Sequence, residues 1–254
     1  MSTARRIWLT GASSGLGGAL AQALLAQGHQ VAISARSLAP LKLLERQFPG
    51  QVLVVAGDLT DRDQVGAIGQ RIEEHWGALD SVILNAGTCE YMDTRQFDAG
   101  IIERVIKTNL MASAYCIEVS LPLLRKGSLP HLVGVSSSVT YLPLTRSQAY
   151  GASKAALRYL YESLRVDLAH EGIDVTVVSP GFVDTPLTAK NDFPMPMKVS
   201  ADTGARYIAE RLHKRPLEIA FPTLFISILR VLAWLPMRLQ LGIAKRMVRQ
   251  GEQG

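Results

Sequence analysis

Tyr150 and Lys154 have the residue types and the spacing that could support proton transfer. They lie four positions apart, at the start of a run over residues 150–170 that has apolar residues at helical spacing and no proline. On a helix, side chains four positions apart share one face. A lysine ammonium beside a phenol favours the phenolate, so we expect the tyrosine pKa to fall from about 10 toward neutrality. The same spacing is common on ordinary exposed helices, so the function of the pair depends on the rest of the chain.

The elements that would position this pair begin near the N-terminus. We expect a strand at residues 7–9, a glycine-rich turn, a helix over residues 19–26 and a second strand at residues 31–33. Glycines in such a turn let the backbone approach a pyrophosphate, whose charge is met by free N–H groups at the helix start. The arrangement predicts nucleotide binding. The residues expected to hold the nucleotide here are Gly11, Ser13, Ser14, Gly15, Leu16 and Gly17.

The end of the second strand indicates which nicotinamide cofactor is preferred. A carboxylate at this point would accept hydrogen bonds from a ribose 2′-hydroxyl, but the chain has Ser34, Ala35 and Arg36 there. A guanidinium can bind a phosphate through two hydrogen bonds. Arg36 therefore predicts NADP(H) in preference to NAD(H), whereas an arginine that only caps an exposed loop would give little preference.

Further strands are expected at residues 52–55, 81–84 and 175–178. In a doubly wound sheet, ligands bind at the carboxyl ends of the strands. Asp58 could accept a hydrogen bond from an adenine amine, and residues 85–87 could bring the backbone close to a ribose. Either segment could instead be an ordinary turn. The residues assigned to the cofactor in these segments are Asp58, Leu59, Asn85, Ala86 and Gly87.

Polar residues also occur inside two apolar segments. Asn109 lies in an expected helix over residues 101–124, where an unpaired buried amide would cost about 1–3 kcal/mol. From the residues alone, Asn109 is more simply a core amide with satisfied hydrogen bonds. Serines at 136–138 follow apolar residues at 133–135, which we expect to form a strand. One of these serines is expected to face the site.

The strand at residues 175–178 leads into a loop, residues 179–186, whose two prolines and one glycine restrict its shape. We expect this loop to pack on a nicotinamide ring through Pro180, Gly181, Val183 and Thr185. The next segment, residues 187–199, has no clean periodicity and holds a phenylalanine and two methionines. It is interpreted as a mobile lid over an apolar substrate pocket.

Together these motifs give the chain a resemblance to the classical short-chain dehydrogenase/reductase family. They occur in the family's order and at its usual spacings. The matching residues are Thr10-Gly11-Ala12-Ser13-Ser14-Gly15-Leu16-Gly17, Asn85-Ala86-Gly87, Asn109, Ser137, Tyr150 with Lys154, and Pro180-Gly181 followed by Thr185. The resemblance covers residues 5–221. It implies a single-domain α/β fold of the Rossmann type, in which a doubly wound parallel sheet of about seven strands carries helices on both faces.

The resemblance also implies hydride transfer between a nicotinamide and a carbonyl or alcohol. Ser137 would hold the substrate oxygen and Tyr150 would donate the proton. Lys154 would lower the tyrosine pKa and bind the nicotinamide ribose, while Asn109 would hold a water that relays protons to the lysine. The expected function is an NADP(H)-dependent oxidoreductase acting on an apolar ketone, aldehyde or secondary alcohol. The alternative is a non-catalytic NADP-binding module that senses redox state and acts through its C-terminal helices.

The composition sets broader bounds on the protein. A length of 254 residues suits one large core, and two cysteines are too few for a disulfide framework. The first basic residues are followed by no apolar stretch that would indicate an export signal, so we expect a cytoplasmic location. Relatives in the resembled family form dimers and tetramers, which implies a homodimer or homotetramer.

Residues 222–254 extend beyond the expected domain of residues 1–221, with helices expected over 223–235 and 237–250. Nine Lys or Arg and two Asp or Glu lie between Arg206 and Gln250. The apolar run at 223–235 is shorter than the roughly 20 residues that span a bilayer. The extension could cover the pocket, pack on a subunit or lie on a membrane surface through residues 222–250, and we favour packing on protein. Nucleic-acid binding is not expected, because no aromatic platform accompanies the basic residues.

Overall fold

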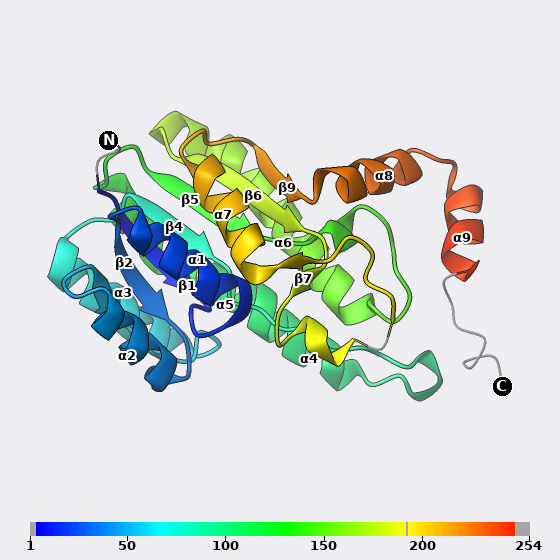
Figure 1. Ribbon diagram of the computed structural model, residues 1–254, viewed down its shortest axis with the longest axis horizontal. Helices are drawn as coiled ribbons and strands as arrows, with labels where there is room; N and C mark the ends of the chain where they lie inside the picture. The colour runs from blue at the N-terminus through cyan, green and yellow to red at the C-terminus, as the bar shows by residue number, and fades with distance from the viewer. Residues whose placement is uncertain (1–3, 192, 247–254) are drawn as a thin grey trace.

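The computed structural model describes residues 4–191 and 193–246, which form a central sheet with helices on both sides (Figure 1). Within these residues, seven strands make one sheet in the order β3-β2-β1-β4-β5-β6-β9, and neighbouring strands are parallel. The strands are β1 (Arg6–Thr10), β2 (Gln30–Ser34), β3 (Val52–Val54), β4 (Ser81–Leu84), β5 (His131–Val135), β6 (Asp174–Pro180) and β9 (Glu218–Phe221). The predicted doubly wound parallel sheet is confirmed.

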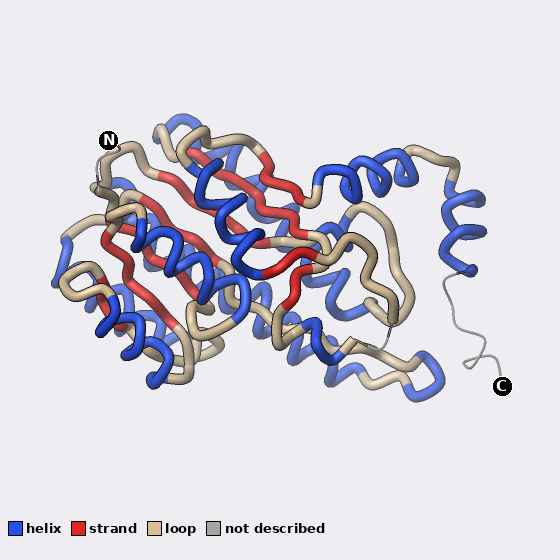
Figure 2. Tube along the Cα trace, viewed as in Figure 1, coloured by secondary structure: helices blue, strands red, loops and turns tan. Residues whose placement is uncertain are grey.

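The order of the strands reverses at β1, in the middle of the sheet. Ile7 of β1 is in register with Val31 of β2 on one side and with Ser81 of β4 on the other. The chain first builds outward through β2 and β3, and then returns to build β4, β5, β6 and β9 on the other side of β1 (Figure 2). Ligands of such sheets bind outside the carboxyl ends of the strands at this reversal.

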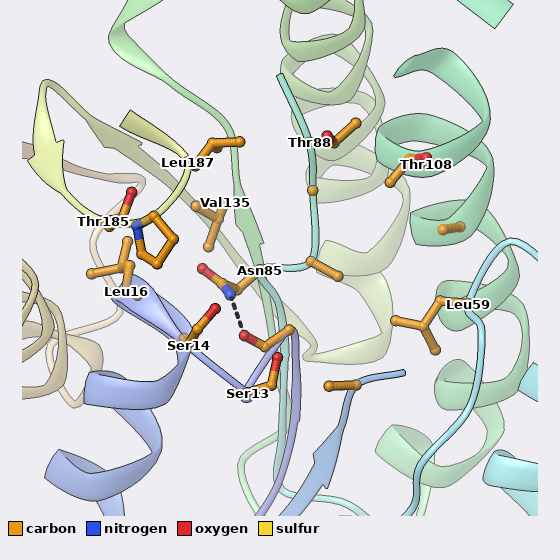
Figure 3. Close-up of a pocket in the computed structure, with 18 of the residues that line it drawn as sticks. Ser13, Ser14, Leu16, Leu59, Asn85, Thr88, Thr108, Val135, Thr185 and Leu187 are labelled. Carbon is orange, nitrogen blue, oxygen red and sulfur yellow. Dashed lines mark hydrogen bonds between the residues drawn. The ribbon is translucent and has the colours of Figure 1, made fainter. Parts of the chain in front are cut away.

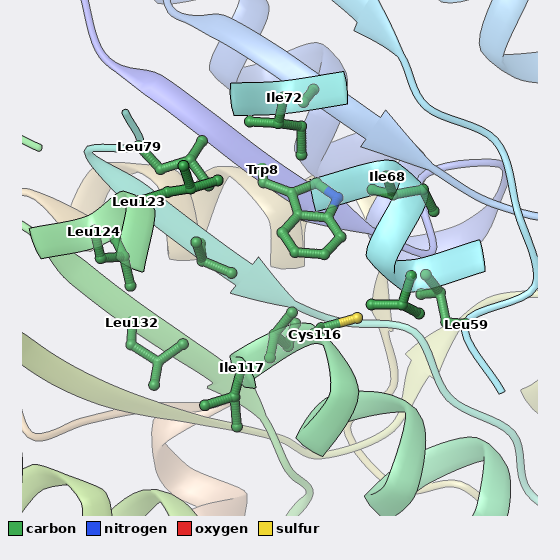
Figure 4. Close-up of a cluster of buried hydrophobic side chains, with 14 of the residues drawn as sticks. Trp8, Leu59, Ile68, Ile72, Leu79, Cys116, Ile117, Leu123, Leu124 and Leu132 are labelled. Atoms are coloured by element: carbon green, nitrogen blue, oxygen red, sulfur yellow. The ribbon is translucent and has the colours of Figure 1, made fainter. Parts of the chain in front are cut away.

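The strands have apolar residues at consecutive positions, and successive residues of a strand point to opposite sides of the sheet. Both faces of the sheet are therefore apolar. Ile7 and Leu9 of β1 belong to one buried cluster, whereas Trp8 belongs to the other (Figure 4). Trp8 is fully buried, and its indole Nε1 donates a 2.8 Å hydrogen bond to Ser34 Oγ. The first cluster includes residues of α1 (Gly15–Ala26), α2 (Leu38–Gln47) and α7 (Ala201–Leu212), and the second includes residues of α3 (Arg62–Trp76), α5 (Ala112–Arg125) and α6 (Gln148–Leu168).

The helical run predicted over residues 101–124 is helical throughout but changes type in the middle. α4 (Ala99–Ile106) and α5 are joined by a π-helical turn at Lys107–Met111, and Asn109 lies inside this turn. The predicted helical run is therefore confirmed, with a π-helical turn inside it. Turns of this kind occur frequently at functional sites.

The segment predicted to form a lid is framed by a second, two-stranded parallel sheet. β7 (Val183–Asp184) pairs with β8 (Val199–Ser200) and so brings together the two ends of the segment between them. Part of this segment is regular, because Thr188–Lys190 forms a 3-10 turn. Further 3-10 turns lie at Thr94–Gln96, Ser138–Thr140 and Ala169–Glu171.

Two helices follow the last strand of the sheet. α8 (Thr223–Ala233) and α9 (Met237–Arg246) extend beyond β9 and away from the body of the molecule (Figure 1). The second helix was expected to reach residue 250, and residues 247–250 lie outside the described part of the chain. Among residues 4–191 and 193–246, no helix has the length and apolar character needed to cross a bilayer.

Candidate active site

A cavity of about 670 Å³ opens where the carboxyl ends of the strands meet the glycine-rich turn (Figure 3). Its wall brings together almost every residue that the sequence assigned to the site. The predicted cofactor residues in the wall are Gly11, Ser13, Ser14, Gly15, Leu16, Gly17, Arg36, Asp58, Leu59, Asn85, Ala86, Gly87, Pro180, Gly181, Val183 and Thr185. Ser137, Tyr150 and Lys154 also line it, whereas Asn109 is fully buried behind the wall.

The turn after β1 is built for close approach of backbone to a ligand. Gly11 and Gly15 have φ values of +70° and +55°, which favour glycine. A Cβ at Gly17 would overlap the carbonyl oxygen of Gly11, so no side chain fits there. Ser14, the N-cap of α1, forms no side-chain cap, and the first turn of α1 has no acidic residue. The positive end of α1 therefore faces the cavity without a competing side-chain anion, as an anion site requires.

Asn85 supports this turn from the neighbouring strand. The hydroxyl of Thr10 accepts hydrogen bonds from the backbone N–H groups of Asn85 and Ala86, at 3.0 and 3.1 Å. In return, Asn85 Nδ2 donates to the carbonyl oxygens of Thr10 and Gly11, at 3.1 and 3.4 Å. The ends of β1 and β4 are thereby held together beside the cavity (Figure 3).

Arg36 and Asp58 lie in the part of the wall formed after β2 and β3. Arg36 is exposed and makes no hydrogen bond or ion pair with any other residue in the described ranges, so its guanidinium can bind a ligand. Asp58 has a structural partner, because its Oδ1 accepts hydrogen bonds from the backbone N–H and the hydroxyl of Thr60, both at 2.9 Å. The turn interpretation of Asp58 therefore applies, although Asp58 also lines the cavity.

Tyr150 and Lys154 share a face of α6 that looks toward the end of β5. Lys154 Nζ lies 5.8 Å from the centre of the Tyr150 ring and donates a 2.9 Å hydrogen bond to the carbonyl oxygen of Val135. Ser137 and Tyr150 both line the cavity, and the Ser137 side chain is close enough to the phenol to lower its pKa. Ser136 points the other way, since its hydroxyl donates to the Lys154 carbonyl at 3.0 Å. The structure thus places Ser137, rather than Ser136, beside the phenol.

The pKa values of Tyr150 and Lys154 differ from those expected from their spacing. Desolvation raises the pKa of Tyr150 to about 12, and the nearby Ser137 side chain offsets this only in part. Desolvation also lowers the pKa of Lys154 to about 8. The prediction that the lysine brings the phenol pKa toward neutrality was wrong, because burial disfavours both charged forms and the ammonium is directed at a carbonyl oxygen. The phenol keeps its proton at neutral pH.

Asn109 is a satisfied core amide. Its Oδ1 accepts a hydrogen bond from the Thr88 backbone N–H at 2.7 Å, and its Nδ2 donates to the Thr88 carbonyl at 3.0 Å and to Ser153 Oγ at 2.8 Å. Ser153 in turn donates to the carbonyl of Tyr150 at 2.8 Å. Asn109 therefore links the segment after β4 to the first turns of α6. The expectation of buried, paired hydrogen-bonding groups is confirmed.

A line of aromatic rings lies next to Gly181 and Val183, which line the cavity. Phe182 lies 5.6 Å from Phe225 of α8 and 6.1 Å from Phe193, measured between ring centres. Phe193 lies 5.6 Å from Tyr91 in an edge-to-face arrangement. Three separate segments of the chain thus form one aromatic wall, consisting of Tyr91, Phe193, Phe182 and Phe225.

A partly buried carboxylate connects the loops of the site to the C-terminal helices. Glu218 of β9 accepts hydrogen bonds of 2.6 Å from each of Tyr141, Arg158, Ser179 and Arg230. Burial alone would raise the pKa of Glu218, but the hydrogen bonds from Arg158, Ser179 and Tyr141 outweigh it and lower the pKa to about 2. The network fixes the loop after β5, the end of β6 and the start of the C-terminal extension relative to one another.

The sequence analysis missed several of these groups. The carbonyl of Val135 and the backbone of Thr88 carry no side-chain signal, so residue types could not reveal them. In the sequence, Glu218 is a single acidic residue in an expected strand. Its partners come from four separate segments, so no local pattern indicates the network. Ser153 could have been found, because it lies one helical turn from Tyr150 on the helix that carries the lysine.

Comparison with known proteins supports the same family throughout. A profile of the family described as short chain dehydrogenase matches residues 5–194. The chain is similar to an uncharacterized oxidoreductase of Myxococcus xanthus, with 36% identity over 221 residues, covering 86% of this chain and 87% of the relative. An uncharacterized oxidoreductase of Mycobacterium tuberculosis is 35% identical over 227 residues, covering 87% and 89%. The crystal structure of a short-chain dehydrogenase from Streptomyces avermitilis has the same fold, with a TM-score of 0.81, 23% identity and coverage of 96% and 97%.

Proposed function

Since this chain belongs to the short-chain dehydrogenase family, we propose that it is an NADP(H)-dependent oxidoreductase that reduces an apolar ketone or aldehyde to the alcohol. The observation that supports this most directly is the meeting of Ser137, Tyr150 and Lys154 in the wall of the cavity that begins at the glycine-rich turn. A proton donor, a second hydroxyl and a cation are thereby placed beside a site suited to a dinucleotide.

The cavity fits a nicotinamide dinucleotide. The glycine turn and the uncapped start of α1 would hold the pyrophosphate. Arg36, whose guanidinium has no competing partner in the described chain, would bind the 2′-phosphate of NADP. A Cβ at Gly87 would lie 3.3 Å from Lys154 Nζ, so glycine keeps the space beside the ammonium open for a ribose. Pro180, Gly181, Val183 and Thr185 would contact the nicotinamide end.

The residues of the chain supply the proton and the positioning. When bound, NADPH supplies the hydride. Ser137 donates a hydrogen bond to the substrate oxygen and holds it next to the phenol. Tyr150, whose raised pKa keeps it protonated at neutral pH, donates its proton to that oxygen. Lys154 stabilises the phenolate left behind and is itself held by the Val135 carbonyl.

Asn109 acts as a positioning residue behind Tyr150 and Lys154. Its hydrogen bond to Ser153 and the further bond from Ser153 to the Tyr150 carbonyl restrain the turn of α6 that carries the phenol. Its π-helical turn also brings residues 107 and 108 to the cavity wall. We propose that protons reach Lys154 along a water path beside this turn.

An apolar substrate suits the aromatic wall of Tyr91, Phe193, Phe182 and Phe225, because ring faces and edges stabilise hydrocarbon by burial.

A homodimer or homotetramer suits the exposed apolar side chains of α6, such as Tyr159 and Val166. The free cysteines Cys89 and Cys116 suit the reducing conditions of a cytoplasm.

The proposal is tested by following NADPH absorbance with the purified protein and a panel of ketones and aldehydes of increasing hydrocarbon length, with NADH in parallel. We expect turnover with NADPH and a kcat/KM that rises with the apolar length of the carbonyl compound. Binding of NADPH with no turnover across the panel would contradict the proposal and would favour the non-catalytic redox-sensing alternative.

A further inference from the structure

The C-terminal extension exposes seven large apolar side chains. On α8, Leu224, Ile228 and Val231 recur at helical spacing on the outer face, with exposed fractions of 63%, 44% and 67%. Trp234, directly after α8, is 91% exposed. α9 adds Met237, Leu239 and Leu241, each more than half exposed. We call these seven side chains the outer face of the extension.

The inner face of α8 is already occupied by protein. Ile226 and Leu229 are buried, and Phe225 lies against Phe182 and Gly181. α8 therefore has two apolar sides, one packed on its own domain and one exposed, with Thr223, Ser227 and Arg230 along one boundary between them. A helix of this character is normally buried on both sides. The outer face thus needs a partner outside the described part of the chain.

The charge of the extension indicates what that partner is. Residues 223–250 contain five Lys or Arg and no Asp or Glu. Arg230 is already paired with Glu218, but Arg238 and Lys245 of α9 are exposed. A second copy of the same surface would bring like charges together. The combination of an apolar face, an exposed tryptophan and unopposed basic residues suits the interface of an anionic lipid bilayer.

We propose that α8 and α9 dock on the surface of an anionic bilayer, with the outer face turned toward the lipid and Arg238 and Lys245 at the headgroups. The docked helix α8 carries Phe225, which lies against Phe182 between the cavity-lining residues Gly181 and Val183, so an apolar substrate could pass from the lipid along these rings into the cavity. This last consequence rests on the proposed function, whereas docking itself does not.

Docking is measured by co-sedimentation of the wild-type protein with vesicles, without cofactor or substrate. One set of vesicles is phosphatidylcholine alone, and the other is phosphatidylcholine with phosphatidylglycerol. We expect at least about tenfold stronger binding to the anionic set, because each basic side chain near the surface adds about 1 kcal/mol. High salt should weaken this binding. A protein that stays in the supernatant with anionic vesicles overturns the proposal.

Two matched pairs of variants locate the contact. Leu224→Asp on the outer face should reduce binding about tenfold or more, whereas Leu43→Asp, an exposed leucine on α2, should not. Arg238→Glu should reduce binding to the anionic set, whereas Arg46→Glu on α2 should not. Circular dichroism checks that every variant is folded. If Leu224→Asp fails to fold, the Arg238 and Arg46 pair decides the question on its own.

Trp234 supplies a spectroscopic readout that does not depend on sedimentation. Trp8 is fully buried and Trp76 is partly buried, so entry of the exposed Trp234 into lipid should shift the emission to the blue on addition of anionic vesicles. Trp234→Phe should remove the shift and keep the protein on the vesicles. Equal sedimentation of wild type and Leu224→Asp overturns the proposal, because the outer face would then make no contact with the lipid. Loss of a dimer in Leu224→Asp, with no vesicle binding by the wild type, overturns it in favour of a subunit contact.

Discussion

Lys154 Nζ donates a 2.9 Å hydrogen bond to the carbonyl oxygen of Val135, the last residue of β5. This bond fastens the first turns of α6 to the strand that leads directly into Ser137. As a result, the phenol of Tyr150 meets the serine hydroxyl in the cavity wall. The ammonium that is expected to assist catalysis is therefore also the group that aligns the two loops of the site.

Replacement of Tyr150 by Phe removes the proposed proton donor and leaves the ring in place. We expect kcat to fall by about 10³-fold, within the range for loss of a general acid, and NADPH affinity to stay unchanged. Steady-state kinetics and cofactor fluorescence measure the two quantities. Tyr159→Phe is the matched control, because Tyr159 lies on the same helix but is 77% exposed. Turnover by Tyr150→Phe at the wild-type rate would remove the assignment.

Replacement of Arg36 by Asp should shift cofactor preference from NADP toward NAD. The loss of a charge-assisted hydrogen bond, worth about 1.5–3 kcal/mol, should lower kcat/KM for NADPH about 10- to 150-fold. The new carboxylate can accept hydrogen bonds from the ribose hydroxyl of NADH. Arg46→Asp, a nearby exposed arginine on α2, should leave the ratio of the two kcat/KM values as in the wild type. An unshifted ratio in Arg36→Asp would refute the preference for NADP.

Gly17 and Gly18 are adjacent in α1 but differ in the space around them. A Cβ at Gly17 would overlap the Gly11 carbonyl and Asn85 Nδ2, whereas a Cβ at Gly18 would lie 3.5 Å from the Ala12 carbonyl. We expect Gly17→Ala to lower the free energy of unfolding by about 1–3 kcal/mol and to weaken NADPH binding. Gly18→Ala should fold and bind as the wild type does. Urea unfolding and cofactor titration measure both, and equal behaviour of the two variants would contradict the close-approach argument.

Glu218 should make stability depend on pH. Its folded-state pKa of about 2 lies below the ordinary 4.5, so its contribution is complete above pH 4.5 and is lost as the pH falls toward 2. The shift corresponds to about 3 kcal/mol. Glu218→Gln should therefore lower the free energy of unfolding by about this amount at pH 7, and the difference from wild type should shrink at pH 3.

The control for this prediction is Glu171→Gln. Glu171 pairs with Arg125 in an exposed ion pair, so its replacement should change stability little at either pH. Denaturant unfolding at the two pH values measures all three proteins. A difference between wild type and Glu218→Gln that stayed constant from pH 7 to pH 3 would contradict the linkage.

The order of the elements could be read from the sequence because it depends on local patterns. Apolar runs at strand length, helical spacing of apolar residues and the glycines after the first strand are properties of short segments. They determined the doubly wound sheet, the glycine-rich turn after the first strand and the spacing of Tyr150 and Lys154. The π-helical turn at Lys107–Met111 could not be read in this way, since its apolar pattern continues that of a regular helix.

Contacts between distant segments were decided only by the tertiary structure. Asn109 finds its partners at Thr88 and Ser153, and Glu218 gathers hydrogen bonds from four elements. The direction of the Tyr150 pKa shift was also decided only by the tertiary structure. Spacing along a helix brings a cation near the phenol, but desolvation depends on how much protein closes over the group, and that closure is a property of the folded chain alone.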